Sequence, residues 1–275
     1  IKEITEKSVT TDAARVGVDL KGTARVGPGN CNCPLAVTRS AVYFVLRAVT
    51  DPDIPASAGA FAPVTIDAPE GCLVNARPPA AVAGGNVETS SRIVDAVFAA
   101  FSQAIPVPAQ GQGTMNNLTL GGPGFTYYET LGGGQGASRD ADGPSAVNVA
   151  MSTTLNTPIE ALEVAYPLRV IEYRLRRGSG GDGRHRGGDG VVRTLQALCD
   201  MEASVIAERR RSAPAGGAGG ADGSPGATLL NGTRLPAKWR GRLRAGDRLS
   251  LLTPGGGGYG PPGDPTGPTA DQGVV

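Results

Sequence analysis

The stretch YYETLGGGQGASRDADGPS, residues 127–145, decides between two kinds of fold. It contains G-x-G-x-x-A at Gly132, Gly134 and Ala137, directly after an apolar, strand-like run, which is the outline of a dinucleotide-binding turn. Such a turn needs a helix behind it, whose N-terminus faces the phosphates. Residues 138–145 contain two aspartates, a glycine and a proline, so no helix is expected there and the acidic side chains would repel phosphate. The pattern therefore disfavours a nucleotide-binding fold.

The overall composition is that of a globular protein with an unusual content of glycine. Of 275 residues, 42 are glycine and 22 are proline, while 40% are apolar and 19% are charged. Glycine and proline alternate with patterned apolar segments, which indicates loops between strands rather than disorder. The formal net charge of +1 gives no electrostatic footprint for nucleic acid or for an anionic membrane. No apolar run is long enough to span a bilayer, so we expect a soluble, cytoplasmic protein.

Two helices are expected in the first 110 residues. Residues 34–49 (PLAVTRSAVYFVLRAV) place apolar side chains on one helical face, and Asn32 is the expected N-cap. A second helix begins at Thr89 or Ser90, either of which can cap it, and repeats apolar residues at i, i+4 spacing. It ends before Pro106.

Most of the remaining chain has the pattern of strands separated by glycine-rich turns. Short apolar runs predict strands at 14–20, 64–67, 117–130, 145–151, 168–176, 190–198, 203–209 and 247–253. Residues 212–227 (SAPAGGAGGADGSPGA) are expected to be a loop, and residues 263–275 a disordered tail. The predicted fold class is α+β: a strand-rich domain with two early helices and many glycine-rich turns.

Motifs of several common enzymes are missing from the sequence. No G-x-x-x-x-G-K is present, so a nucleotide used in the reaction is expected on another chain. No G-x-S-x-G is present, and His185 is the only histidine, which excludes a site with two imidazoles from this chain. We predict no metal site and no cofactor in this chain, because the cysteines have no metal-binding spacing: they are Cys31, Cys33, Cys72 and Cys199.

The loop that contains the histidine has two interpretations. Its sequence, RLRRGSGGDGRHRGGDGVVR at 174–193, is typical of a solvated turn between two strands. The alternative is a contact with an anion or a carboxylate through Arg184 and Arg186, since guanidinium groups bind both.

Polar residues in an apolar, glycine-rich context are the candidates for a site. Asn86 and Glu88 stand at the start of the second helix, Asn116 and Asn117 at the entrance to a strand, and Glu129 at its exit. Glycines let backbones approach a ligand closely, and amides and carboxylates there can orient a polar substrate. The alternative is that these side chains only cap turns and helix ends.

Seven segments occur together in the order of one known family. They are NCPLAVTRSAVYFVLRAVTDPDIP (32–55), PEGCLVNARPPAAVAGGNVETSSRIVDAV (69–97), GTMNN (113–117), YYETLGGGQGA (127–137), NTPIEALEVAYPLRV (156–170), SGGDGRHRGGDGVVR (179–193) and GDRLSLLTPGGGGYGPP (246–262). From about residue 16 to 262, the chain resembles the hydantoinase B/oxoprolinase family.

The resemblance implies that residues 1–262 are the C-terminal part of a B-type component, and we expect a longer protein. In this family the B component works with an A-type component that carries an actin-like ATP-binding fold. Phosphorylation of the substrate then lets water open a lactam or hydantoin ring, as in the conversion of 5-oxoproline to glutamate. ATP is therefore expected on the partner, in a hetero-oligomer. Carboxylases of acetone and acetophenone belong to the same superfamily.

Two departures from the family pattern bear on activity. The family's His- and Asp-bearing metal motif belongs to the N-terminal half, which this sequence does not include, so a divalent metal is expected there. Where the family commonly has V-H-x-H-M-T-N-T-x-N-T-P, this chain has VNVAMSTTLNTP at 147–158. Asn148 and Ala150 replace the usual histidines, and Thr153 the usual asparagine. The positions that still match are Asn156, Pro158 and Glu160.

Three functions are open on the sequence. The first is a subunit of an ATP-dependent cyclic-amide hydrolase, the second a subunit of an ATP-dependent ketone carboxylase, and the third a non-catalytic assembly module. No catalytic base is assigned. The residues expected to line a substrate cleft or a subunit contact are Asn86, Glu88, Asn116, Asn117, Glu129 and Gly133.

Overall fold

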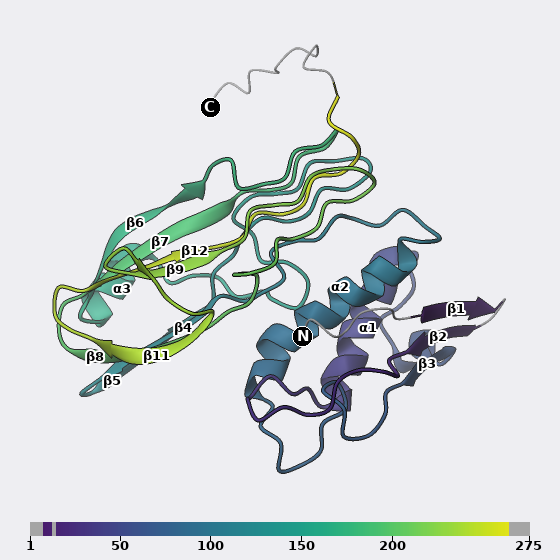
Figure 1. Ribbon diagram of the computed structural model, residues 1–275, viewed down its shortest axis with the longest axis horizontal. Coiled ribbons are helices and arrows are strands. Elements are labelled where there is room, and N and C mark those ends of the chain that lie inside the picture. Colours follow the sequence, from purple (N-terminus) through teal and green to yellow (C-terminus); the bar gives the residue numbers. More distant parts are fainter. Residues whose placement is uncertain (1–7, 13–14, 264–275) are drawn as a thin grey trace.

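The computed structural model describes residues 8–12 and 15–263, which form two layers joined by extended segments (Figure 1). The N-terminal layer holds the helices α1 (Leu35–Val49) and α2 (Ser90–Phe101), the 3₁₀ turn η1 (Ala58–Phe61) and the π-helical turn η2 (Gly85–Thr89). Its strands are β1 (Ser8–Asp12), β2 (Arg15–Asp19) and β3 (Val64–Asp67). β2 pairs antiparallel with β1 and parallel with β3.

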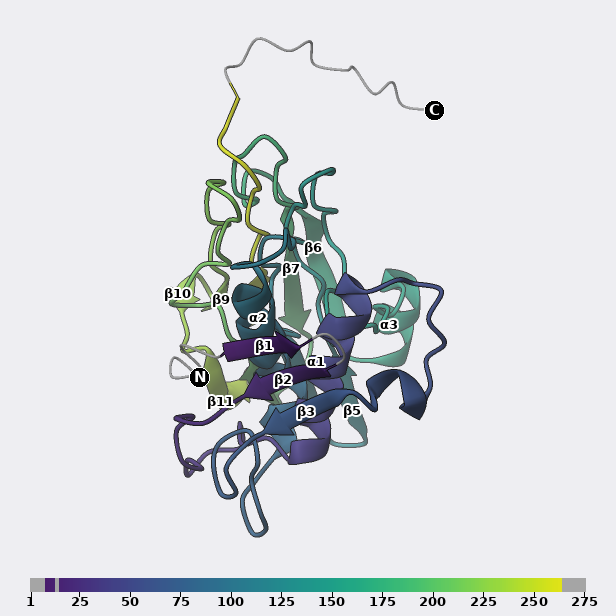
Figure 2. The same ribbon diagram turned by 90° about the vertical axis from the view of Figure 1, so that its right-hand side faces the viewer.

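One apolar cluster holds the N-terminal layer together. Apolar residues recur at helical spacing on α1 and α2, so each helix presents one face to the other. Figure 2 shows the three-stranded sheet in front of these helices, where it covers the cluster. Burial of each large apolar side chain contributes roughly 1.5–3 kcal/mol. Buried members of the cluster include Val18, Ala41, Val42, Val45, Leu46, Ile93, Val94 and Val97.

The C-terminal layer is a sandwich of two sheets with its own apolar core. One sheet has the order β10-β9-β12-β7-β6 and the other the order β11-β8-β4-β5. The strands are β4 (Asn117–Gly122), β5 (Phe125–Glu129), β6 (Leu168–Arg176), β7 (Gly190–Ala197), β8 (Met201–Ile206), β9 (Ala227–Leu230), β10 (Thr233–Arg234), β11 (Lys238–Leu243) and β12 (Arg248–Leu252). The short helix α3 (Ile159–Ala165) lies beside β6 (Figure 1). Both sheets contribute to the core, which includes Leu118, Leu120, Leu168, Leu195, Ala203, Val205, Leu249 and Leu251.

Extended glycine-rich segments continue from the sheets as a bundle that has no strand assignment (Figure 1). They are hydrogen bonded across the bundle: Gly188 N donates to the carbonyl of Gln135 and Gly256 N to that of Gly188, each at 2.9 Å. A Cβ atom at Gly256 would overlap the carbonyl oxygen of Gln135. Only glycine permits such close backbones, as at the axis of the collagen triple helix. The glycine content therefore builds a packed element rather than loose loops.

The structure confirms the predicted α+β class, with corrections to individual strands. The predicted strand 117–130 is a hairpin of β4 and β5, because Pro123 and Gly124 form a turn with Gly124 at φ 81°. The predicted strand 145–151 was wrong: only Val147 makes a bridge, to Gly133, and Ala150 has a positive φ. The predictions missed β1, β9, β10, β11 and α3.

The predicted N-cap of α1 was wrong, and Thr89 holds the N-cap position of α2 without a capping hydrogen bond from its side chain. Pro34 occupies the cap position of α1, and Asn32 instead donates to the carbonyls of Gly29 and Ala81 at 2.8 and 3.0 Å. The π-helical turn η2 precedes α2, and neither Thr89 nor Ser90 caps the helix with its side chain. Thr89 donates to the carbonyl of Cys31 at 2.5 Å, which ties the start of α2 to the preceding loop.

Within 8–12 and 15–263, no helix combines the length and the apolar character that a membrane crossing requires. All but the first residue of the predicted tail 263–275 lies outside the described residues.

Candidate functional site

A buried carboxyl group, Glu88, is the centre of the first polar network. It lies at the end of η2 and its side chain is fully buried. Its Oε1 accepts hydrogen bonds from Asn117 Nδ2 at 2.8 Å and from the Met115 amide at 3.3 Å. Its Oε2 has no partner among the described residues. Burial raises the pKa of Glu88 to about 8, because desolvation penalises the charged form more than nearby donors favour it.

Asn117 connects this carboxyl group to the surface. Its Nδ2 also donates to the carbonyl of Ile206 on β8, at 2.8 Å. Its Oδ1 accepts from the Tyr128 hydroxyl at 2.7 Å, and Tyr128 is 52% exposed. A chain of hydrogen bonds therefore runs from a protonatable buried group to solvent along one face of the four-stranded sheet.

Asn116 joins the same region to the glycine-rich bundle. Its backbone is in the left-handed conformation, with φ 48°, and its side chain is fully buried. Asn116 Nδ2 donates to Gln112 Oε1 and Arg210 donates to Asn116 Oδ1, both at 2.8 Å. Gly133 packs against Gln112, whose Oε1 a Cβ atom there would overlap. Burial lowers the pKa of Arg210 to about 10, which leaves it charged near neutral pH.

A second buried network centres on Glu129, on the other face of the same sheet. Glu129 follows Tyr128, and successive residues of a strand point to opposite faces. Its Oε1 accepts from Arg193 Nε at 3.1 Å, and its Oε2 from the Tyr127 hydroxyl at 2.9 Å and Asn156 Nδ2 at 3.2 Å. This network lies between the two sheets, apart from Glu88.

The structure thus brings four of the six cleft candidates together: Glu88, Asn116, Asn117 and Gly133. Asn86 is exposed, and its carbonyl accepts a hydrogen bond from the Ser90 hydroxyl at 2.6 Å. That the six residues line a substrate cleft or a subunit contact stays a prediction.

The two arginines predicted to contact an anion lie elsewhere. Arg184 and Arg186 are exposed, on either side of His185, which bridges to Tyr259 in the glycine-rich bundle. Arg186 lies 3.7 Å from Asp182 and 3.5 Å from Asp189, and His185 Nδ1 lies 3.4 Å from Asp142. The turn is therefore of mixed charge, and anion binding there remains a prediction.

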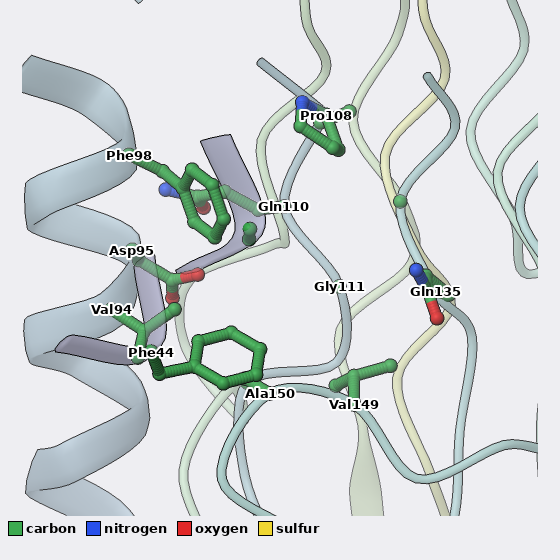
Figure 3. Close-up of a pocket in the computed structure, with 14 residues that line it drawn as sticks. Phe44, Val94, Asp95, Phe98, Pro108, Gln110, Gly111, Gln135, Val149 and Ala150 are labelled. Atoms are coloured by element: carbon green, nitrogen blue, oxygen red, sulfur yellow. The ribbon is translucent and has the colours of Figure 1, made fainter. Parts of the chain in front are cut away.

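A cavity of about 150 Å³ lies where α2 meets the glycine-rich segments (Figure 3). Side chains of α1 and α2 form one side, and Gln135 and Val149 stand on the other. Ala150, at one of the two positions where the family pattern has histidine, also lines it. The sequence reasoning missed Asp95 and Gln110 in its wall. Two features of the sequence could have indicated them: Asp95 borders the apolar face of the second helix, and Gln110 precedes a glycine in a segment without helix or strand pattern.

No group of three or more His, Cys, Asp or Glu side chains within 8–12 and 15–263 is placed to hold a metal ion. The divalent metal that the resemblance implies is expected in the N-terminal half of the family's B component, and we assign no chemistry to a metal here. The four cysteines are free.

The fold is α+β, and the chain belongs to the hydantoinase B/oxoprolinase family, whose profile matches residues 4–262. It is 43% identical over 254 residues to an uncharacterized protein of Methanocaldococcus jannaschii, covering 90% of this chain and 45% of that protein. It is 41% identical over 258 residues to 5-oxoprolinase 1 of Arabidopsis thaliana, covering 92% of this chain and 20% of that protein. It is 31% identical over 274 residues to the B-type component of a putative D-/L-hydantoinase of Pseudomonas sp., covering 93% and 46%. The chain thus spans between a fifth and about half of the length of these relatives.

Two solved structures have the same fold. The ATP-dependent caprolactamase of Pseudomonas jessenii superposes with a TM-score of 0.83 at 26% identity, covering 93% of this chain and 48% of that one. The nucleotide-free acetone carboxylase superposes with a TM-score of 0.72 at 18% identity, covering 92% of this chain and 40% of that one. The second likeness concerns the fold alone.

Proposed function

We propose that this chain is the C-terminal part of a B-type component of an ATP-dependent cyclic-amide hydrolase. The observation that carries the proposal is the family match over residues 4–262, with relatives named as a 5-oxoprolinase and as a D-/L-hydantoinase component. The likeness to an ATP-dependent caprolactamase supports it. 5-Oxoproline, hydantoins and caprolactam share one reactive group, a ring amide whose N–H and C=O lie on the same edge.

In the proposed reaction, ATP supplies the driving force for opening an unreactive amide. The γ-phosphoryl group passes to the amide oxygen, water adds to the activated carbon, and the C–N bond breaks to leave an amine and an acyl phosphate. A second water hydrolyses the acyl phosphate. The products are the ring-opened acid (an amino acid from a lactam, an N-carbamoyl amino acid from a hydantoin), ADP and phosphate. No phosphate-binding loop motif occurs in this sequence, so we place ATP on an A-type partner in a hetero-oligomer.

The role of this chain is to shape part of the substrate region. Glu88, with a pKa raised to about 8, holds a proton near neutral pH, and its link through Asn117 to Tyr128 gives a route to solvent. Asn116 and Gly133 fix the neighbouring glycine-rich backbone through Gln112. We assign these residues to positioning, and no general base among them.

The test uses the complete B-type component with its A-type partner. We expect 5-oxoproline, hydantoin or a lactam to stimulate ATP hydrolysis, with ring-opened product accumulating. The second candidate is a ketone carboxylase, because the fold resembles that of acetone carboxylase. Bicarbonate-dependent ATP consumption with acetone or acetophenone would indicate that function instead. A complex that forms but turns over no substrate would identify an assembly module.

A further inference from the structure

We propose that an arginine-lined cavity, formed by the segment after β8 and by the connection from β10 to β11, binds a phosphate group. The ligand would be inorganic phosphate or a small phosphate monoester. This arginine cavity has a volume of about 660 Å³ and is separate from the cavity beside α2. The proposal goes beyond the proposed function, because it concerns an anion bound by this chain itself.

The lining of the arginine cavity carries an excess of positive charge. Two of its basic groups have a carboxylate as a neighbour. Arg209 Nη2 lies 2.7 Å from Asp95 Oδ2, and Lys238 Nζ lies 2.5 Å from the carboxylate of the lining residue Glu208. The other basic groups form no ion pair within 8–12 and 15–263, so their charges have no close counter-charge there. They are Arg210, Arg211 and Arg234.

Arg210 is the buried member of this set, and its guanidinium group is fixed in place. The residue is 8% exposed, and its Nη1 donates to Asn116 Oδ1 at 2.8 Å and to the Glu208 carbonyl at 3.0 Å. Its Nη2 lies 3.4 Å from Thr228 Oγ1. Its Nε has no hydrogen-bond partner among the described residues. The acceptors that hold Arg210 are neutral, so they orient its charge without compensating it.

Neighbouring guanidinium groups repel one another at this site. The pKa of Arg210 is lowered to about 10, chiefly by burial and in part by repulsion from Arg176 and Arg234, although Glu88 opposes the decrease. Burial and repulsion from Arg234 likewise lower the pKa of Arg176. All three groups stay charged near neutral pH. An anion bound among them would relieve this repulsion.

A phosphate group suits this arrangement better than a single carboxylate does. A phosphate monoester carries close to two negative charges near neutral pH, and its terminal oxygens can accept from several guanidinium groups at once. A monocarboxylate has one charge and would leave most of the excess charge uncompensated. Arg211 and Arg234 are exposed, so their side chains can adjust to a ligand. The volume also leaves room for the substituent of a monoester, against Leu235 and Pro236 in the lining.

The environment differs from that of Arg186, for which the sequence also allowed an anion contact. Arg186 lies 3.7 Å from Asp182 and 3.5 Å from Asp189, so its charge is already offset. Arg211 and Arg234 have no such neighbour in the part of the chain that the structure describes. A free anion therefore gains more at the arginine cavity.

The first test titrates inorganic phosphate into the full-length purified protein by calorimetry, without ATP or a partner and at constant ionic strength. Arg211→Gln removes one charge from an exposed side chain, so the fold and the Tm in chloride buffer should be unchanged. Phosphate binding should weaken about tenfold in Arg211→Gln, since hydrogen bonds to charged groups are the strong ones. The double variant Arg211→Gln/Arg234→Gln should lose about thirtyfold or more.

The matched control is Arg248→Gln, at an exposed position on β12 outside the lining. It makes the same change in net charge as Arg211→Gln and should bind phosphate within about twofold of the parent protein, because distant surface charges are screened by salt. Equal weakening in Arg248→Gln and Arg211→Gln would show an effect of net charge alone and would overturn the proposal. Absence of saturable phosphate binding by the parent protein would overturn it as well.

The second test compares ligands on the parent protein. Acetate at the same ionic strength should bind at least about tenfold more weakly than phosphate, because it carries one charge. Acetate binding as tight as that of phosphate would contradict a phosphate site. Phenyl phosphate distinguishes the two sources of the group. If it binds at least as tightly as phosphate and loses affinity in Arg211→Gln, the cavity takes monoesters; if it binds more weakly than phosphate, the cavity takes the free ion.

Discussion

Glu129 Oε1 lies 3.1 Å from Arg193 Nε, and this buried ion pair joins the two sheets of the sandwich. Glu129 belongs to β5 in one sheet and Arg193 to β7 in the other, and Arg193 has no exposed surface. The guanidinium group lies 4.6 Å from the ring centroid of Tyr173. Its two terminal nitrogens have no hydrogen-bond partner among the described residues, so Glu129 is the main compensation for its charge.

Breaking this pair on one side should be more harmful than removing both charges. Arg193→Met leaves the Glu129 carboxylate buried without its cation, at an expected cost of about 3–5 kcal/mol in the free energy of unfolding. The double variant Arg193→Met/Glu129→Gln should recover at least half of that loss, because Gln still accepts from Tyr127 without a charge. Urea denaturation measures both. A double variant no more stable than Arg193→Met would show that the lost packing, and not the orphaned charge, dominates.

Glu88 should make the stability of the protein depend on pH. Its pKa is about 8 in the folded state and near 4.5 when unfolding exposes it. Between these values the folded state holds a proton that the unfolded state releases, so stability falls as pH rises from about 4.5 to 8 and levels off above 8. Glu88→Gln should remove this slope, a change of roughly 3–4 kcal/mol between pH 5 and pH 8.

The measurement is urea unfolding of both proteins across that pH range. Glu160→Gln, at an exposed position on α3, is the matched control and should leave the slope unchanged. If the pH dependence of the unfolding free energy persists in the Glu88→Gln variant, another group causes it.

The glycine-rich bundle should tolerate no side chain at its closest approaches. Gly256→Ala would force a Cβ atom into the carbonyl of Gln135 and should cost about 3 kcal/mol or more. The control is Gly59→Ala in η1, where the nearest atom lies 3.6 Å away, and its effect should stay within about 1 kcal/mol. Thermal unfolding compares the two. Similar Tm values would contradict close packing in the bundle.

Local patterns in the sequence predicted much of the fold. α1 and α2 follow from apolar residues at helical spacing, and β6, β7 and β12 from short apolar runs bounded by turns. The glycine-rich bundle could not be predicted in this way, because its hydrogen bonds join residues far apart in sequence, such as Gln135 and Gly188. Segments without hydrophobic periodicity carry no local sign of such pairing.

The candidate site was predicted only in part for a related reason. Glu88 and Asn117 were identified individually, and the structure joins them by a hydrogen bond. Their separation from Glu129 arises because Tyr128, which is bonded to Asn117, and Glu129 point to opposite faces of β5. The prediction of one strand over 117–130 could not fix these faces. The pairing of Asp95 with Gln110 depends on Arg209, 114 residues after Asp95 in the chain. Such a contact exists only in the folded protein.

The most direct test of the proposed function is the ratio of ring-opened product to ATP hydrolysed by the complete B-type component with its A-type partner. Hydantoin, 2-pyrrolidinone and 5-oxoproline would be assayed with and without bicarbonate. The account predicts one molecule of ring-opened product per ATP with at least one of these substrates, independent of bicarbonate. ATP hydrolysis that no ring amide stimulates, in a complex shown to be assembled, would contradict it.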